Sequence, residues 1–436
     1  MIALLTNPII VSVILLCILC LCRVNVLLAL IISAVVGGVS SHMGISQVMH
    51  IFVRGMGDNA ETALSYILLG AFAASMTHTG LAPILSMKIS NAIKSKKYVL
   101  IFILTGMAIL SQNLIPVHIA FIPILVPPLL YIMNELKIDR RSVACALAFG
   151  LKAPYIMIPA GFGLIFQGLI SENMVQNGVE VLKNDVWKST WVLGVGMFIG
   201  FLVAIFISYV KPRVYENLEV KLEPEKIDLT LHKGHYITLI AAVLTLVIQL
   251  WTGSLPLGAL VGLAVIFGFR AVDHDKMDKL INEGVGLMGY VAFVMLVAAG
   301  FASVMKSTGA IDALVNSVAP LMMSSKVIAA FLMLFVGLFI TMGIGTSFGT
   351  IPILAVLYIP VCLKLGFSVP SMIIILAAAA ALGDAGSQAS DTTLGPTAGL
   401  NADGQHNHIW DTCVPTFLHY NIPLILVAVL SVLVLG

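Results

Sequence analysis

Charged residues are scarce in this sequence. Only 10% of its 436 residues are Asp, Glu, Lys or Arg, whereas 59% are hydrophobic. A soluble domain carries roughly 25% charged residues, so this chain has too few to cover a water-facing surface. Its apolar residues come in blocks rather than in alternation, which excludes a β-barrel. We therefore expect an all-α polytopic membrane protein.

Several functional signatures are also missing from the sequence. It has no nucleotide-binding glycine loop and no constellation of metal ligands, so we expect no enzyme and no cofactor. His406 and His408 form an H-x-H without a Cys pair, which favours a structured polar loop over zinc. No basic cluster with interleaved aromatics suggests nucleic acid. The opening stretch "MIALLTNPIIVSVILLCILCLC" lacks a basic n-region and a cleavage site, so we interpret it as a retained first span.

The chain contains an internal repeat at an offset of 229 residues. The stretch "GMGDNAETALSYILLGAFAASMTHTGL" (55–81) matches "GVGLMGYVAFVMLVAAGFASVMKSTGA" (284–310) at 8 of 27 positions without a gap. Unrelated helices of this composition share about two such positions. The tetrapeptide "IPIL" also recurs at 122–125 and 351–354. These matches indicate a duplication.

Basic residues predict the orientation of the two halves. "KSKK" (94–97), "KIDRR" (137–141) and the polar stretch 211–235 should be cytoplasmic. The first two flank the interrupted apolar run 98–133, which must then enter the membrane and return as a re-entrant hairpin. Each half has about five spanning helices plus a hairpin and a broken helix. Because the first half crosses the membrane an odd number of times, the second half starts on the opposite side of the membrane and has inverted topology, as in secondary transporters.

This organisation gives a first transmembrane repeat (1–210), a cytoplasmic linker (211–235) and a second, inverted repeat (236–436). We expect a multi-pass protein of the plasma (inner) membrane with both termini outside. Its permanent partner is then the lipid bilayer.

Four interrupted segments carry the polar chemistry: hairpins near 98–133 and 327–366, and broken helices near 142–167 and 369–395. A charged side chain at mid-membrane costs on the order of 3 kcal/mol or more, so it usually marks a function. Carboxylate, hydroxyl and carbonyl oxygens suit Na⁺ and protons rather than transition metals. The candidate ion- or substrate-binding residues are Ser111, Gln112, Asn113 and His118 in the first hairpin; Gly345, Thr346, Ser347, Gly349 and Thr350 in the second; Lys152 in the first broken helix; and Asp384, Ser387, Ser390, Asp391 and Thr392 in the second.

Structural alternatives stay open for several of these residues. Asp391 can instead cap a helix in the sequence "SDTT". Asp384 can cap a helix or pair with Lys152, and Lys152 can form a structural salt bridge or snorkel. His118 can be a hydrogen-bonded packing residue.

At these residues the chain resembles the NhaC-type sodium/proton antiporters of the ion-transporter superfamily. "GTSFGTIPIL" (345–354) is similar to their G-[TS]-S-W-G-T hairpin signature, with Phe348 in place of tryptophan. "GDAGSQASDTT" followed by "HIWDTCVP" resembles their G-D-x-x-S-P-x-S-D-T-T pattern, with Gln388 in place of proline. The segment "LGPTAGLNADGQHNHIWD" resembles a subgroup assigned as sodium/proton antiporters or amino-acid permeases. The resemblance implies an elevator-like carrier with ion sites at the hairpin tips, and it makes a homodimer plausible.

Two functions follow as hypotheses. In the first, the chain exchanges Na⁺ for H⁺: Asp391, helped by Asp384, binds either Na⁺ or a proton but not both, and Asp391 with Thr392 is the expected Na⁺ site. In the alternative, Na⁺ or H⁺ drives uptake of a zwitterionic solute such as an amino acid. Lys152 or a hairpin N-terminus then holds the solute's carboxylate, and Asp384 or Asp391 holds its ammonium. Opposite charges on the two symmetry-related broken helices favour this alternative.

Overall fold

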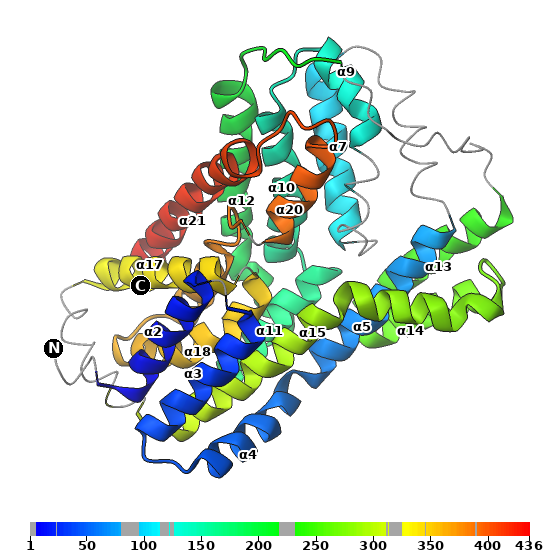
Figure 1. The fold of residues 1–436 in the computed structure, drawn as a ribbon. Coiled ribbons are helices and arrows are strands. Elements are labelled where there is room, and N and C mark those ends of the chain that lie inside the picture. The colour runs from blue at the N-terminus through cyan, green and yellow to red at the C-terminus, as the bar shows by residue number, and fades with distance from the viewer. Residues whose placement is uncertain are drawn as a thin grey trace.

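The computed structural model describes residues 6–22, 24–79, 96–113, 122, 126–217, 232–310, 313, 325–344, 346–388 and 390–436. Every regular element in these ranges is helical, and the helices form two packed bodies (Figure 1). The pocket described below lies between the two bodies.

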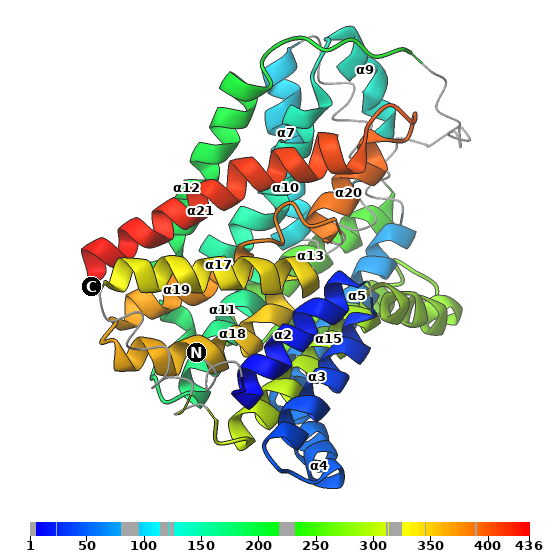
Figure 2. The same cartoon turned by 60° about the vertical axis from the view of Figure 1, so that its left-hand side comes forward.

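The first body combines the start of each sequence half. Its elements are α2 (Pro8–Leu21), α3 (Val26–Ser40), α4 (Ile45–Gly55), η1 (Met56–Asn59), α5 (Ala60–His78), α13 (Lys233–Thr252), α14 (Leu255–Gly268), η5 (His274–Lys276) and α15 (Met277–Ser307). Helices α5 and α15, which contain the matching stretches of the sequence repeat, lie side by side at its centre (Figures 1 and 2). A Cβ on Gly70 would lie 2.5 Å from the Gly284 carbonyl oxygen, so glycine permits this close approach.

The second body combines the end of each half. Its elements are α7 (Lys97–Asn113), η2 (Pro127–Leu129), α9 (Leu130–Glu135), α10 (Arg140–Met157), α11 (Phe162–Gln176), η3 (Lys183–Asp185), α12 (Trp187–Val203), η4 (Ala204–Ser208), α17 (Lys326–Ile344), α18 (Ser347–Lys364), α19 (Val369–Ala381), α20 (Asp391–Leu400), η6 (His408–Cys413) and α21 (Val414–Leu435). Helix α21 packs along α12 and also contacts α10 and α17 (Figure 2). The two bodies meet mainly where α15 packs on α18 and where α2 packs on α17.

Helix starts recur at the offset found in the sequence. The pairs α3/α14, α7/α17, α10/α19 and α11/α20 each begin 229 residues apart. This agreement extends the duplication from residues to elements. The opposite orientation of the halves stays a prediction. Helix α13 begins at Lys233, inside the expected linker 211–235, because His232 and His235 form a capping box at its start.

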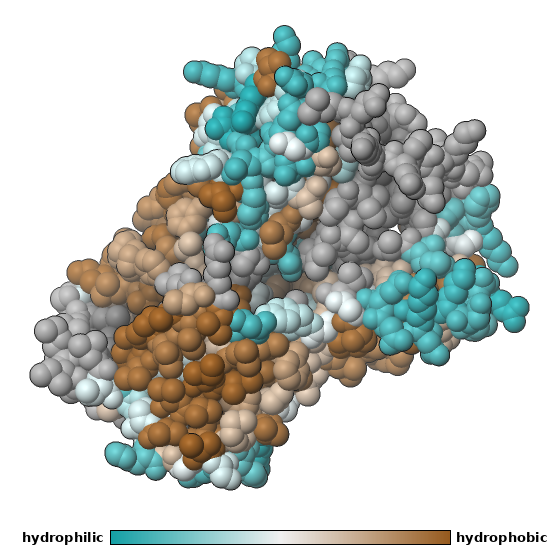
Figure 3. All heavy atoms as spheres, in the orientation of Figure 1, coloured by the Kyte–Doolittle hydropathy of each residue, from teal (hydrophilic) through white to brown (hydrophobic). Residues whose placement is uncertain are grey.

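Five helical stretches in the described ranges are long and apolar enough to cross a membrane, and the bent pair α10–α11 counts as a sixth. Hydrophobic side chains cover much of the face formed around α2, α3 and α15, whereas hydrophilic ones gather at the end of the molecule near α9 (Figure 3). The shorter apolar helices in these ranges are α3, α7, α14, α17 and α19.

Candidate functional site

The first broken helix is interrupted where the sequence places two prolines. Pro154 lies inside α10 and Pro159 follows its end, and the chain resumes as α11 at Phe162 with a bend of 47°. Gly161 takes a φ of 56° at the break, a conformation that suits glycine. Tyr155 before the break and Phe162 after it both line the pocket described below.

The second broken helix is interrupted between Ala381 and Asp391. Gly383 and Gly386 have φ angles of 79° and 99°, so the left-handed turns there depend on glycine. Asn421 of α21 donates from Nδ2 to the Ala385 carbonyl at 3.0 Å and so supports the unwound backbone. Ser390 is the N-cap of α20, which leaves Asp391 as the first helical residue and not the cap.

Lys152 and Asp384 form a buried ion pair between the two broken helices. The distance from Lys152 Nζ to Asp384 Oδ2 is 2.7 Å, and the two side chains are 0% and 6% exposed. Ser347, the first residue of α18, donates to the same oxygen at 2.6 Å, and Tyr155 donates to it at 3.2 Å. The Ser390 hydroxyl donates to the other oxygen, Oδ1. Both oxygens of Asp384 are therefore satisfied by the protein.

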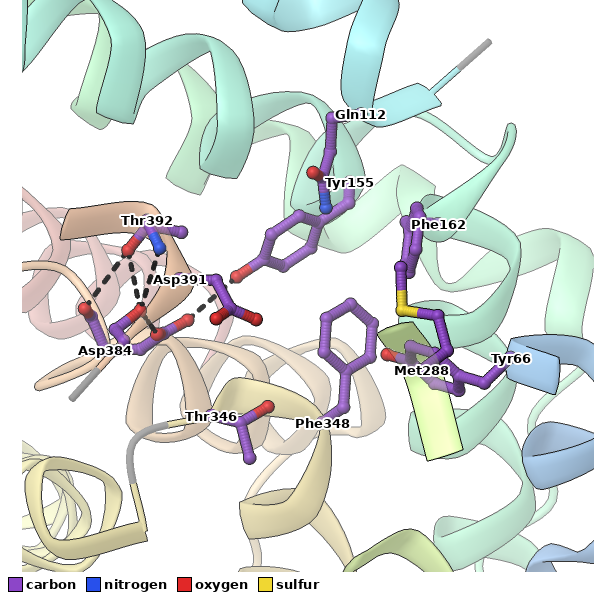
Figure 4. A pocket seen from close by; sticks show the side chains of 11 residues that line it. Tyr66, Gln112, Tyr155, Phe162, Met288, Thr346, Phe348, Asp384, Asp391 and Thr392 are labelled. Atoms are coloured by element: carbon purple, nitrogen blue, oxygen red, sulfur yellow. Dashed lines mark hydrogen bonds between the residues drawn. The ribbon is translucent and has the colours of Figure 1, made fainter. Parts of the chain in front are cut away.

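Asp391 lies in a different situation. Its carboxylate extends into a small pocket, on the side that faces Phe348 (Figure 4). The pocket is partly open to solvent, and Asp391 is an exposed residue at it. Within the described ranges the carboxylate makes no ion pair and no hydrogen bond. A charged group in such a place needs a proton, a cation or water.

The pocket lies between the two bodies. Tyr66 of α5 and Met288 of α15 line it from the first body (Figure 4). The second body supplies the remaining lining residues, which are Gln112, Tyr155, Phe162, Thr346, Phe348, Asp384, Ser390, Asp391 and Thr392. Its volume of about 40 Å³ holds only a few water molecules.

Six predicted site residues line this pocket. Gln112, at the end of α7, is 4% exposed, and its Oε1 atom has no hydrogen-bond partner among the described residues. Gln112 of the first hairpin and Thr346 of the second thus share one cavity. The full set is Gln112, Thr346, Asp384, Ser390, Asp391 and Thr392.

Other predicted residues lie beside the pocket. Ser347 and Lys152 bind Asp384 from outside the cavity. Ser111 and Thr350 donate their hydroxyls within their own helices, to Ala108 and Thr346. The remaining cases are Gly349, which packs near Met295, and Ser387, whose hydroxyl approaches the Met342 carbonyl at 3.5 Å. His118, Gly345 and the side chain of Asn113 lie outside the described residues. The binding roles of all these residues stay predictions.

Sequence reasoning missed the aromatic wall of the site. The rings of Tyr155 and Phe162 lie 5.1 and 6.0 Å from the Phe348 ring, measured between centroids. The repeat itself offered a signal, because Tyr155 and Phe162 occupy the positions equivalent to Asp384 and Asp391. Tyr66, whose ring lies 6.0 Å from that of Phe348, carried no such signal.

A second polar cluster, which joins Arg140 to the polar loop around His406, lies at the end of the second body near α9. Arg140, the first residue of α10, binds both oxygens of Asp403 and the Leu400 carbonyl at the end of α20. Burial alone would raise the pKa of Asp403, but the Arg140 guanidinium outweighs it and holds that pKa below its usual range. Burial lowers the pKa of the neighbouring His406 to about 4. This cluster joins the outer ends of the two broken helices.

Broken helices that meet at a buried ion pair, in a chain of membrane-spanning helices, define a secondary transporter. Residues 146–430 match the family described as the Na⁺/H⁺ antiporter family, and residues 7–93 match a second model with the description Na⁺-H⁺ antiporter family. The chain belongs to the Na⁺/H⁺ antiporter family. It is therefore a multi-pass membrane protein of the transporter class.

Relatives of similar length carry different names. The chain is 46% identical over 444 residues to the "Putative amino acid transporter YuiF" of Bacillus subtilis, covering 98% of this chain and all of that protein. It is 45% identical over 441 residues to the uncharacterized membrane protein VP2115 of Vibrio parahaemolyticus, again covering 98% of this chain and all of the relative.

Two solved transporters share the fold. The YdaH transporter of Alcanivorax borkumensis matches with a TM-score of 0.61 and 15% identity, covering 90% of this chain and 88% of that one. MtrF of Neisseria gonorrhoeae, which is described with a class of antimetabolite efflux pumps, matches with a TM-score of 0.59 and 16% identity. That match covers 90% of this chain and 85% of MtrF.

Proposed function

We propose that this protein exchanges Na⁺ for H⁺ at Asp391. The observation that carries the proposal is the contrast between two neighbouring carboxylates. Asp384 has both oxygens bonded by the protein, whereas Asp391 faces the pocket without a partner in the described ranges. A carboxylate that binds either a cation or a proton, but not both, couples the two fluxes by competition.

The surroundings of Asp391 suit a small monovalent cation. Thr346 and Thr392, which carry hydroxyl oxygens, and Gln112, which carries an amide oxygen, line the pocket. Such hard oxygen ligands favour Na⁺ over transition metals. A volume of about 40 Å³ accommodates one Na⁺ with water completing its shell. The exchange needs no cofactor.

Alternating access is expected to follow from the two-body architecture. Both carboxylates of the pocket, Asp384 and Asp391, belong to the second body. Tyr66 and Met288 of the first body line the pocket from the other side. An elevator-like displacement of the second body along α5 and α15 would carry Asp391 from one side of the membrane to the other. We expect the plasma (inner) membrane as its location, with linker 211–235 cytoplasmic, both termini outside and a homodimer as the assembly.

Replacement of Asp391 tests this proposal. Asp391→Asn keeps the shape of the side chain but cannot exchange a proton for Na⁺, so we expect Na⁺/H⁺ exchange in proteoliposomes to fall at least 100-fold. Asp185→Asn, at an exposed carboxylate paired with Lys188, is the matched control and should exchange like the wild type. Both variants must elute from size-exclusion chromatography as folded protein. Full exchange by Asp391→Asn would refute the proposal.

A second candidate function is cation-coupled transport of a zwitterionic solute such as an amino acid. Lys152 and Asp384 place opposite charges 2.7 Å apart beside the pocket. The carboxylate of such a solute could bind Lys152, and its ammonium could bind Asp384. The name of the YuiF relative supports the same candidate. A thermal-shift screen against amino acids, with and without Na⁺, separates the two functions, because only a solute carrier gives a solute-specific shift.

A further inference from the structure

Lys152 has an unusual position for a buried lysine. Its side chain is fully buried, yet it does not line the pocket beside it. Its ammonium contacts Asp384 Oδ2 at 2.7 Å and Ser347 Oγ at 3.4 Å. The Tyr155 hydroxyl lies 3.0 Å from that serine oxygen and 3.2 Å from the carboxylate oxygen. The ammonium therefore approaches an oxygen cluster built from one carboxylate and two hydroxyls.

This cluster has the composition of a monovalent cation site. Carboxylate and hydroxyl oxygens are ligands that Na⁺ accepts, and an ammonium satisfies the same oxygens with hydrogen bonds. One carboxylate oxygen cannot hold both cations at one position. We propose that Asp384 and Ser347, with Tyr155, form a second cation site in which the ammonium of Lys152 is the resident cation.

The position of the cluster supports a site rather than an incidental salt bridge. Tyr155 and Asp384 occupy equivalent positions of the two repeats and hydrogen-bond directly to each other. Ser347 adds the tip of the second hairpin, so three of the four interrupted segments contribute oxygen atoms. Interrupted segments that converge in this way are where transporters bind ions.

The ammonium of Lys152 determines which carboxylate of the pocket can exchange Na⁺ for H⁺. While Lys152 is in place, Asp384 is closed to Na⁺, and among the described lining residues Asp391 is the acidic one that stays open to it. Lys152 therefore acts as a specificity-determining residue that sets the number of Na⁺ ions bound per chain. The inference rests on the proposed function only for the assignment of Na⁺ to Asp391.

Binding of radioactive sodium to the purified full-length protein tests the inference. The wild type should bind about one Na⁺ per chain, and Lys152→Ala should bind about two, because the vacated oxygens accept Na⁺. The Lys152→Ala, Asp391→Asn variant should keep about one, and further replacement with Asp384→Asn should remove it. Lys188→Ala also removes an ammonium that lies 2.6 Å from a carboxylate, but at the surface, and should gain no Na⁺.

The outcomes separate this inference from the proposed function. No gain of Na⁺ in folded Lys152→Ala would overturn the inference, whatever Asp391 does. An absence of Na⁺ from the wild type, together with a gain in Lys152→Ala, would refute Na⁺ binding at Asp391 and uphold the second site.

Asp384→Asn on its own is an independent arm for the case in which Lys152→Ala does not fold. With Lys152 present, this variant should bind as many Na⁺ ions as the wild type, because Asp384 holds no Na⁺. Loss of Na⁺ from folded Asp384→Asn would overturn the inference.

Discussion

At the scale of single residues, the environment assigns different roles to chemically identical groups. Asp384 and Asp391 lie seven positions apart, yet hydroxyls and an ammonium bind the first, and the second faces a cavity. His406 and His408 differ in a similar way. His406 is buried and bonds to Thr412, whereas His408 is part-buried and bonds to Thr397.

His406 should make the protein sensitive to acid. Its pKa is about 4 in the folded state against 6.5 for the unperturbed group, so unfolding takes up a proton as the pH falls below about 6.5. Stability should therefore decrease by about 2 kcal/mol between pH 7 and pH 5. His406→Gln should lose less stability over this interval, as measured by melting temperatures at each pH. His274→Gln, at an exposed histidine, is the control, and equal pH slopes in all three proteins would contradict the assignment.

The sequence predicted the polar residues of the candidate site but not the aromatic residues that line it. Charges inside apolar runs and glycine–hydroxyl clusters identified Asp384, Asp391 and the second hairpin, because such groups are costly in lipid. Tyr66 and Phe162 could not be recognised, since aromatic residues are ordinary in membrane helices and only packing shows which of them meet at Phe348. Pairing of Lys152 with Asp384 was one alternative that the sequence left open, and the choice among the alternatives required the structure, because the two residues lie 232 positions apart.

At the scale of elements, the function depends on interruptions of helices. The break after α19 brings Asp384, Ser390 and Asp391 to one pocket. In a continuous helix, Asp384 and Asp391 would share a face but lie about 10 Å apart along the axis, and Ser390 would point in another direction. The prolines and the repeat predicted interruptions within 142–167 and 369–395, and the structure ends α10 at Met157 and α19 at Ala381. The extent of the second break could not be predicted, because it depends on tertiary support from Asn421 and on glycines with positive φ.

Gly386→Ala should damage the second break. The new Cβ would lie 2.5 Å from the Phe417 Cβ and 2.9 Å from the Cys413 carbonyl oxygen, in addition to the strain of a φ of 99°. We expect a lower melting temperature and a loss of transport. Gly404→Ala provides the control, because its φ is 78° but no atom lies within 4 Å of the new Cβ. Gly404→Ala should lower the free energy of unfolding by only about 1–2 kcal/mol, because of backbone strain alone. Equal effects of the two substitutions would show that packing at the break is not required.

At the scale of the whole molecule, the central feature is a pocket shared by two bodies. Helix contacts between the bodies are concentrated where α15 packs on α18 and α2 packs on α17. One hydrophobic core includes buried residues of both bodies. Relative motion of the bodies as rigid units, as the proposed function requires, would have to break the contacts at these places. Composition alone predicted a polytopic helical protein, but the grouping of helices from both halves into each body depended on contacts far apart in sequence.

A cross-link between the bodies should stop transport without touching the pocket. Lys183 of the second body approaches Gly253 of the first, with its Nζ 3.5 Å from the Gly253 carbonyl oxygen. Cysteines at these two positions, in a background without reactive native thiols, should be joined by a short cleavable thiol reagent. We expect loss of transport on cross-linking and recovery on cleavage. Undiminished transport by the cross-linked protein would contradict relative motion of the bodies.

The most direct measurement is flux in proteoliposomes under separately imposed gradients. With a fluorescent pH indicator inside and no pH gradient at the start, an outward Na⁺ gradient should acidify the lumen as protons enter in exchange for Na⁺. A pH gradient alone should in turn drive radioactive sodium in the opposite direction. Neither response should occur in Asp391→Asn. The contradicting result is proton movement by the wild type that needs no Na⁺ gradient and occurs only when an amino acid is present. That result would rule out exchange of Na⁺ for H⁺ at Asp391.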